Sequence, residues 1–362
     1  MAETSLKRMA GIAWQLPGVL RQAMAIHHGS LLGVSKRLYA TMKQRYTPDE
    51  ALVEGLLNPS LPDEELDRRC SQSTISRIQR KRSPATWRPL ISDKGVFYRY
   101  CEAAGIPVPP LFAIFSRTTP GWTCKGRLLV RREEWVSYFT KECPPEFVIK
   151  PSTGRRGGGI RFLRRTGTEF QTPDGQTFSA AGLYDGMVEN RSTETFIIQA
   201  RLRNHPALEE LHGTKALHTI RIATALTPDA KCIVLFAMYK VIGGSAYVDN
   251  ICHGRTGNIP VGVDLENGII LEDRHDGGNS PMVHPKSGLP LTGYRVPYWR
   301  EAVALAMEAA LKFSPIGMVG WDVAVTPNGP VIIEGNLWFE IFSASDARPI
   351  LAALAATDAR PD

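Results

Sequence analysis

The sequence predicts an α+β fold preceded by a helical N-terminal region. Within residues 1–85, apolar side chains such as Leu20, Met24 and Leu31 recur at helical spacing. Beyond residue 105, short apolar runs bounded by Gly, Pro and Asn are typical of strands, and helical patterns interrupt them. A chain of 362 residues is long enough to form two or three subdomains around a sizeable core.

The composition favours a soluble globular protein, with 43% hydrophobic and 22% charged residues. The net charge of +7 is uneven: residues 1–90 contain 14 Lys and Arg against 8 Asp and Glu, and the remainder contains 29 against 28. We interpret the basic segment 77–88 as a solvated face or linker, with contact to an acidic polymer or a membrane surface as the alternative. Because no recognised nucleic-acid motif is present, no nucleic-acid partner is expected.

Six cysteines are scattered through the chain without metal-ligand spacing. Free thiols in a reducing compartment are therefore expected, and with them a cytoplasmic location. No apolar run reaches transmembrane length. Gln15, Pro17 and Arg21 interrupt the N-terminal apolar stretch, so we predict no signal peptide there. The sequence gives no oligomeric state.

Three helix starts can be placed from local signals. Thr47–Glu50 and Pro62–Glu65 put acidic residues in a first turn, where the helix dipole favours them. Ser92-Asp93-Lys94 opens a helix that runs through Ala104 and stops at Gly105. Further helices are predicted at Glu133–Phe139, Tyr298–Phe313 and Pro349–Ala356.

Apolar runs predict six strands before residue 245: Leu111–Phe115, Phe147–Lys150, Ile160–Leu163, Phe196–Ala200, His218–Leu226 and Ile233–Val241. The loop Pro151–Gly159 joins the second to the third and is rich in glycine. Such a loop between strands can fold its amides over phosphates, and Lys150 before it could reach an α- or β-phosphate. A flexible hairpin tip of the same composition is the alternative.

The stretch Val319–Asn336 predicts a β-hairpin around an Asn-Gly turn. A five-residue loop, Thr326–Pro330, would place Asp322 opposite Glu334, with Asn336 on the same face two residues later. Mg²⁺ prefers oxygen ligands and is often held by one or two carboxylates together with substrate phosphates. We therefore expect these three polar residues to bind Mg²⁺; solvent-facing polar alternation is the other interpretation.

The order of these parts resembles an ATP-grasp enzyme. A Lys-bearing helix is followed by a strand ending in Lys, a glycine-rich loop, a strand leading into a hinge, a strand carrying Arg, and an Asp/Glu-x-Asn hairpin. The sequences of six segments are similar to those of the sugar-transfer-associated ATP-grasp family: FVIKPSTGRRGGGI, FIIQARL, HTIRIAT, YVDNICHG, HPKSG and GWDVAVTPNGPVIIEGN. The resemblance covers roughly residues 90–345 and rests on the ordered set, because no single motif decides it.

The resemblance implies an ATP-grasp fold, in which two α+β lobes grip ATP. The helical region would occupy residues 1–88, the N-terminal lobe with its glycine-rich lid residues 89–197, and the C-terminal lobe with the metal site residues 198–362. Two positions depart from the family pattern: Ala200 stands where similar sequences commonly have Glu, and His218 stands where they commonly have Asn.

The resemblance also implies groups of site residues. The phosphates of ATP would be held by two lysines and the lid: Lys94, Lys150, Ser152, Thr153, Gly157, Gly158 and Gly159. The adenine would be held by the hinge: Gln199, Ala200, Arg201 and Leu202. The metal ligands would be Asp322, Glu334 and Asn336, and the substrate side would comprise His218, Asp249, Asn250 and Arg255. Arg221 and Lys150 would be catalytic, with Arg221 stabilising the transferring phosphoryl group; the strand pattern alone leaves a surface role for Arg221 equally open.

ATP-grasp enzymes commonly activate a carboxylate as an acyl-phosphate, which a nucleophile then attacks. The resemblance therefore implies an ATP-dependent carboxylate–amine ligase that forms an amide or peptide bond, with ATP and Mg²⁺ as cofactors. Its partners would be a small carboxylic acid and an amine, neither of which the sequence identifies. The alternatives are an ATP-grasp phosphotransferase acting on a hydroxyl group and a non-enzymatic nucleotide-binding protein.

Overall fold

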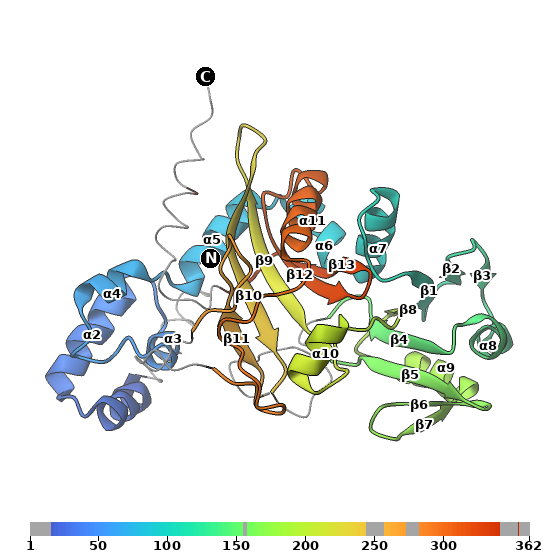
Figure 1. Cartoon of the computed structure of the whole chain (residues 1–362), viewed down its shortest axis with the longest axis horizontal. Helices are drawn as coiled ribbons and strands as arrows, with labels where there is room; N and C mark the ends of the chain where they lie inside the picture. The colour runs from blue at the N-terminus through green and yellow to red at the C-terminus, as the bar shows by residue number, and fades with distance from the viewer. Residues whose placement is uncertain (1–15, 155–157, 244–256, 273–281, 341–353, 355–362) are drawn as a thin grey trace. The chain divides into compact units, whose positions relative to one another are not determined.

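The computed structural model describes residues 16–154, 158–243, 257–272, 282–340 and 354 (Figure 1). Its contacts divide the chain into two compact units. Unit 1 comprises Met1–Arg82, Thr227–Asp229 and Trp338–Asp362, and unit 2 comprises Ser83–Leu226 and Ala230–Leu337. The predicted lobe boundaries at residues 88 and 197 stay predictions. Some predicted features lie outside the described residues: Gly157, Asp249, Asn250, Arg255 and the helix Pro349–Ala356.

The described part of unit 1 is built mainly of helices, as predicted for the N-terminal region. Residues 16–27 form a first helix, and Thr47 and Glu50 exchange side chain-to-backbone hydrogen bonds of 3.2 Å that cap another. This capping box explains why the chain turns helical at the predicted start. The helices that follow residue 27 are α2 (Leu31–Lys43), α3 (Pro48–Val53), α4 (Asp63–Arg68) and α5 (Gln72–Arg82). Their buried core includes Val19, Val34, Leu38, Leu57 and Leu66.

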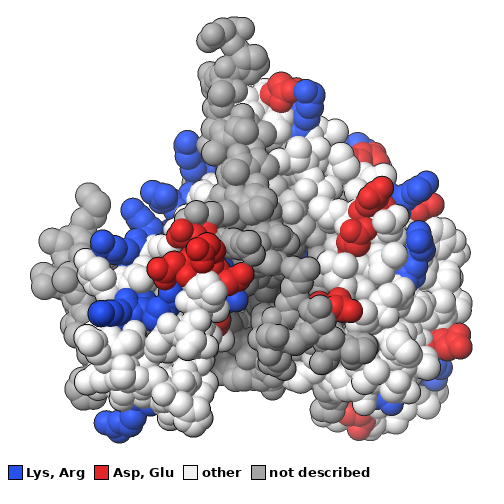
Figure 2. Space-filling model, turned by 60° about the vertical axis from the view of Figure 1, so that its left-hand side comes forward, with Lys and Arg blue, Asp and Glu red and all other residues white. Residues whose placement is uncertain are grey.

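Part of the basic segment 77–88 packs within unit 1. The last turn of α5 contains Arg80 and Arg82; Arg80 lies 5.7 Å from the centroid of the Trp338 ring, and Arg82 donates to the Leu354 carbonyl at 3.0 Å. On the face drawn in Figure 2, basic side chains lie beside acidic ones. Contact with an acidic partner through this segment stays a prediction. None of the helices in the described ranges is long and apolar enough to cross a bilayer.

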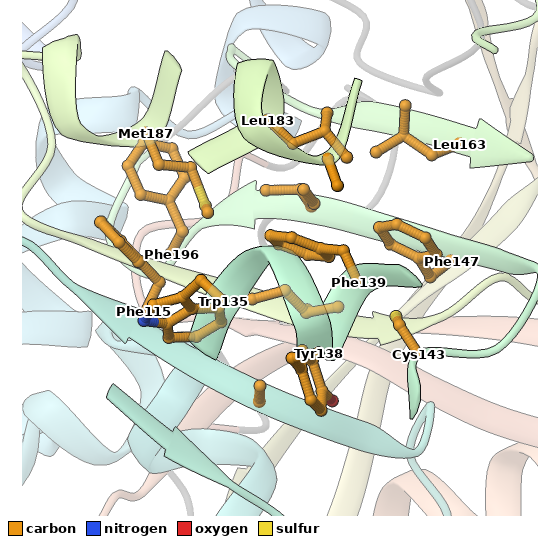
Figure 3. Close-up of a cluster of buried hydrophobic side chains, with 14 of the residues drawn as sticks. Phe115, Trp135, Tyr138, Phe139, Cys143, Phe147, Leu163, Leu183, Met187 and Phe196 are labelled. Atoms are coloured by element: carbon orange, nitrogen blue, oxygen red, sulfur yellow. The ribbon is translucent and has the colours of Figure 1, made fainter. Parts of the chain in front are cut away.

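An eight-stranded antiparallel sheet belongs to unit 2 and has the order β3-β2-β1-β8-β4-β5-β6-β7. Its strands are β1 (Leu111–Ser116), β2 (Gly121–Thr123), β3 (Leu128–Leu129), β4 (Glu146–Pro151), β5 (Arg161–Thr166), β6 (Glu169–Gln171), β7 (Thr177–Ser179) and β8 (Thr195–Ala200). Two helical segments supply the apolar side chains that meet the sheet: α8 (Arg132–Ser137), extended by the π-helix Tyr138–Glu142, and α9 (Ala180–Glu189). Figure 3 shows the resulting core, where Trp135 and Phe139 meet Phe115 and Phe147.

A five-stranded antiparallel sheet of order β11-β10-β9-β12-β13 also belongs to unit 2. Its strands are β9 (Thr219–Leu226), β10 (Cys232–Val241), β11 (Ile259–Gly262), β12 (Met318–Thr326) and β13 (Gly329–Asn336). Helix α11 (Trp299–Lys312) packs on β9, β10, β12 and β13. Trp321 of β12 meets Phe97 of helix α7 (Lys94–Ala103) and Phe313. Shorter helical segments are Ala85–Trp87, α6 (Pro89–Ser92) and α10 (Pro206–His212).

The hairpin β12–β13 corrects one prediction. Thr326 pairs with Gly329, so the turn contains two residues and the five-residue loop Thr326–Pro330 is wrong. The Thr326 hydroxyl donates to the Gly329 carbonyl at 2.7 Å, which closes the short turn. Such a turn alone would place Asp322 opposite Ile333. A β-bulge shifts the register between Asp322 and Val323, so Asp322 does pair with Glu334, as expected.

Candidate functional site

Lys150 owes its position to the alternation of side chains along β4. Phe147 and Ile149 point into the core of the eight-stranded sheet, so Val148 and Lys150 lie on its other face. The register pairs Val148 with Gln199 and Lys150 with Ile197, which puts these four residues on one face. A lysine at the end of a buried strand thus lies beside the predicted hinge.

The Lys150 ammonium is buried, with 5% of the residue exposed, and donates to the Tyr98 hydroxyl at 2.9 Å. Burial lowers the pKa of Lys150 to about 7; the Glu334 carboxylate opposes this shift and the Lys94 ammonium adds to it. A desolvated cation of this kind gains strongly from an anionic ligand, since phosphate oxygens would replace lost water. The described surroundings therefore favour polyphosphate binding at Lys150.

The N-terminus of α7 holds the start of the glycine-rich loop. Asp93 caps the helix by accepting the Val96 N–H, and it also accepts the Ser152 hydroxyl at 2.5 Å. The Ser152 carbonyl accepts the Lys94 N–H at 2.8 Å. The Lys94 ammonium lies 3.4 Å from the Gly154 carbonyl oxygen and 3.7 Å from the Glu334 carboxylate. The structure thus brings together Lys94, Ser152 and Glu334, three of the predicted site residues.

The predicted hinge lies where β8 ends. The Ala200 N–H donates to the Pro110 carbonyl at 2.9 Å, and the Arg201 guanidinium lies 5.8 Å from the centroid of the Phe162 ring. Gln199 is buried, and its Oε1 atom has no hydrogen-bond partner among the described residues. A buried acceptor without a partner costs free energy, which a ligand that donates a hydrogen bond can recover. The exocyclic amine of adenine is such a donor.

Asp322 lies at the centre of a buried charged cluster on the five-stranded sheet. The Arg221 guanidinium donates to both of its oxygens at 2.9 Å, and the Lys240 ammonium donates to Oδ2 at 2.7 Å. The Asn336 amide donates to the same oxygen at 3.3 Å. Burial alone would raise the pKa of the Asp322 carboxyl, but Arg221 and Lys240 outweigh it and hold the pKa well below its usual range. In this state both oxygens of Asp322 are occupied by protein donors.

Glu334 is the more accessible carboxylate of the hairpin. Its side chain is 34% exposed, and its described ion-pair partner, Lys94, lies 3.7 Å away. The cross-strand register places Arg221, Asp322 and Glu334 side by side on three neighbouring strands. A divalent ion could use Glu334 and the Asn336 amide oxygen at once, whereas Asp322 would first exchange hydrogen bonds with its cations.

Sequence reasoning missed Lys240 and Tyr98. Lys240 is the lone charge in the apolar strand Ile233–Val241, the same signal that singles out Arg221, so the pattern did contain it. Tyr98 gave no comparable signal, because a tyrosine on the apolar face of a helix is ordinary core composition.

His218 lies in a separate buried cluster with His212 and His284, whose possible ligand atoms all lie within 4.8 Å of one another. The His212 and His218 rings stack at 3.6 Å and 11°, so they cannot both direct an in-plane lone pair to one ion at about 2.0–2.1 Å. His284 Nδ1 accepts the Lys286 and Ser287 N–H groups, which leaves the ring proton on Nε2. This geometry favours packed neutral rings, and a substrate contact by His218 stays a prediction.

Comparisons with known proteins place the chain in a family. The model of the sugar-transfer-associated ATP-grasp family matches residues 74–344. No curated protein sequence matches. Among solved structures, the biotin carboxylase domain of the Hydrogenobacter thermophilus 2-oxoglutarate carboxylase, in complex with MgADP, ADP and bicarbonate, is similar with a TM-score of 0.41 and 14% identity over 70% of this chain and 41% of that chain. The D-Ala:D-Ser ligase VanG from Enterococcus faecalis is similar with a TM-score of 0.38 and 14% identity over 68% of this chain and 52% of that chain.

A RimK domain ATP-grasp protein from Sphaerobacter thermophilus is similar with a TM-score of 0.36 and 14% identity, over 76% of this chain and 67% of that chain. The chain spans about half or less of the length of the carboxylase and of VanG. The assignment therefore rests on the family model, which covers roughly three quarters of the residues. The predicted fold class is confirmed, and the chain belongs to the sugar-transfer-associated ATP-grasp family.

Proposed function

We propose that this protein is an ATP-dependent ligase that joins a small carboxylic acid to an amine. The observation that carries the proposal is the meeting of two kinds of group in unit 2: cations that suit a polyphosphate, Lys94 and Lys150, and the polar hairpin residues Glu334 and Asn336 beside them. Membership of an ATP-grasp family supports ATP and Mg²⁺ as cofactors.

The described residues fit these cofactors. The buried Gln199 Oε1 suits the adenine amine, Lys150 and Lys94 suit the phosphates, and Glu334 with the Asn336 amide oxygen suits Mg²⁺. When bound, Mg²⁺ would neutralise charge on the phosphates during transfer. Arg221 and Lys240 supply further positive charge next to the proposed Mg²⁺ site. The glycine-rich loop would exclude water from the bound phosphates.

The reaction needs little covalent help from the protein. A carboxylate oxygen of the acid attacks the γ-phosphorus of ATP and ADP leaves, which gives an acyl-phosphate. The amine nitrogen then attacks the carbonyl carbon, inorganic phosphate leaves, and the amine gives up a proton. Positioning and charge neutralisation drive the first step, and the second follows if water is kept away from the acyl-phosphate.

The proposal is tested by measuring ADP release with acids and amines crossed pairwise, and by adding hydroxylamine in place of the amine. A ligase is expected to sustain ADP release over many turnovers only when both substrates are present, and to give a hydroxamate with the correct acid. The Lys150→Met variant should lose both signals while it stays folded. ADP release with an alcohol acceptor and no hydroxamate would instead establish a phosphotransferase, and nucleotide binding without any turnover would establish a binding protein.

A further inference from the structure

The bulge in β13 contains a residue that is not needed to pair Asp322 with Glu334. Val323 pairs with Ile332 and Asp322 pairs with Glu334, so Ile333 is the residue without a partner on β12. A strand lacking Ile333 would bring the same two carboxylates together without a bulge. What the extra residue adds is its carbonyl group, which accepts the Tyr98 hydroxyl at 2.7 Å.

The Tyr98 hydroxyl has three polar neighbours: the Ile333 carbonyl, the Lys150 ammonium and the Gln199 side chain. A phenol has one proton, and Tyr98 gives it to the Ile333 carbonyl. Its oxygen lone pairs are then left to accept the Lys150 ammonium at 2.9 Å. Tyr98 is fully buried, so water does not compete for this bond. The ammonium keeps two further N–H donors for a ligand.

The resulting series of hydrogen bonds connects the two sheets of unit 2. Lys150 belongs to β4 of the eight-stranded sheet, Tyr98 to α7, and Ile333 to β13 of the five-stranded sheet. Lysine has a flexible four-carbon stem, and fixing its ammonium before a ligand arrives removes part of the ordering cost of binding. The neighbouring charged groups are Glu334 and Lys94, which act on Lys150 with opposite sign.

We propose that Tyr98 is a positioning residue: its hydroxyl, held by the Ile333 carbonyl, fixes the Lys150 ammonium for the phosphates of the nucleotide. This inference rests on the proposed function, because it assumes that Lys150 binds phosphate. It assigns Tyr98 no contact with the nucleotide itself. The effect of losing the hydroxyl should therefore depend on the phosphates of the ligand and on the presence of Lys150.

The test compares ADP with adenosine by calorimetry on the full-length chain. Tyr98→Phe keeps the buried ring and removes the hydroxyl, and we expect it to weaken ADP binding by about 3- to 10-fold, the loss of one hydrogen bond. Adenosine binding should weaken clearly less, by no more than the contact of the hydroxyl with the Gln199 side chain contributes. Tyr100→Phe is the matched control. Tyr100 lies on the same helix and donates to the Lys312 carbonyl, so its variant loses the same kind of bond away from Lys150.

A double-mutant cycle completes the test. In a Lys150→Met background, Tyr98→Phe should cause no further loss of ADP affinity. Two results would show that Tyr98 has only a structural role: equal weakening of ADP and adenosine binding by Tyr98→Phe, or the same loss of ADP affinity in the Lys150→Met background as in the wild type. Either result would overturn this inference and leave the proposed function untouched. A wild-type protein that does not prefer ADP over adenosine would overturn the proposed nucleotide site as well.

Discussion

Asp322 and Glu334 stand opposite each other, but they stabilise the protein to different extents. Asp322 is the shared partner of two largely buried cations, Arg221 and Lys240, whose side chains are 13% and 6% exposed. Removing one member of a buried ion pair typically costs about 3–5 kcal/mol, because the remaining buried charge loses a counter-ion. Glu334 is partly exposed and lies farther from Lys94, so its ion pair should contribute about 0–1 kcal/mol.

We therefore expect Asp322→Asn to lower the free energy of unfolding by about 3–5 kcal/mol, and Glu334→Gln to change it by at most about 1 kcal/mol. Both variants should lose Mg²⁺-dependent turnover, because both carboxylates lie beside the proposed ion. Urea unfolding and ADP release at limiting Mg²⁺ measure the two effects separately. Equal stability of the two variants would show that Arg221 and Lys240 do not depend on Asp322, and full turnover in Glu334→Gln would remove it from the metal site.

At the scale of an element, the glycine-rich loop is the part that should close over the nucleotide. Gly159 has a φ of 77°, and a Cβ atom there would lie 3.1 Å from the Pro151 ring. Gly159→Ala should lower the free energy of unfolding by about 1–2 kcal/mol, because alanine is strained in a left-handed backbone conformation. The same strain at the end of the loop should raise the KM for ATP. Steady-state kinetics with varied ATP measure the effect.

Gly167→Ala supplies the control for this prediction. Gly167 lies in the turn between β5 and β6 with a φ of 65°, and a Cβ atom there meets open space. The variant should show a similar loss of stability with no change in the KM for ATP. If the two variants raise the KM equally, the effect reports general strain and the loop has no special part in binding ATP.

The elements show how far the sequence alone can lead. Period and capping signals placed α7, β4 and the hairpin strands close to their positions in the structure, because each depends on neighbours along the chain. The bulge at Ile333 and the partners of Asp322 could not be placed in the same way. Register and burial are set by strands far apart in sequence, and a local pattern carries no information about which cation meets which carboxylate.

At the scale of the whole molecule, the buried histidines should make stability depend on pH. Burial lowers the pKa of His218 to about 3 and also lowers the pKa of His212 and of His284, whereas the unfolded chain titrates near 6.5. Below pH 6.5 the unfolded chain therefore takes up protons that the folded protein does not. The contribution of these histidines to stability is therefore fully present above this pH and should fall below it by up to about 1.4 kcal/mol per pH unit for each histidine.

His284→Asn tests this dependence. An asparagine oxygen can replace Nδ1 as the acceptor for the Lys286 and Ser287 N–H groups, while the titrating ring is removed. The slope of unfolding free energy between pH 7 and pH 5 should decrease, by at most about 1 kcal/mol per pH unit. An unchanged slope in His284→Asn would mean that this ring takes up protons equally in the folded and unfolded states.

The spare residue in β13 also has a consequence for covariation. A chain without Ile333 would still align Asp322 with Glu334, but it would lack the carbonyl that orients Tyr98. The length of β13 and the residue at position 98 should therefore change together among relatives: a hairpin that lacks this one residue should have a side chain other than tyrosine at position 98. An insertion between Thr326 and Gly329 carries no such constraint, since the pairing that aligns the two carboxylates begins after the turn.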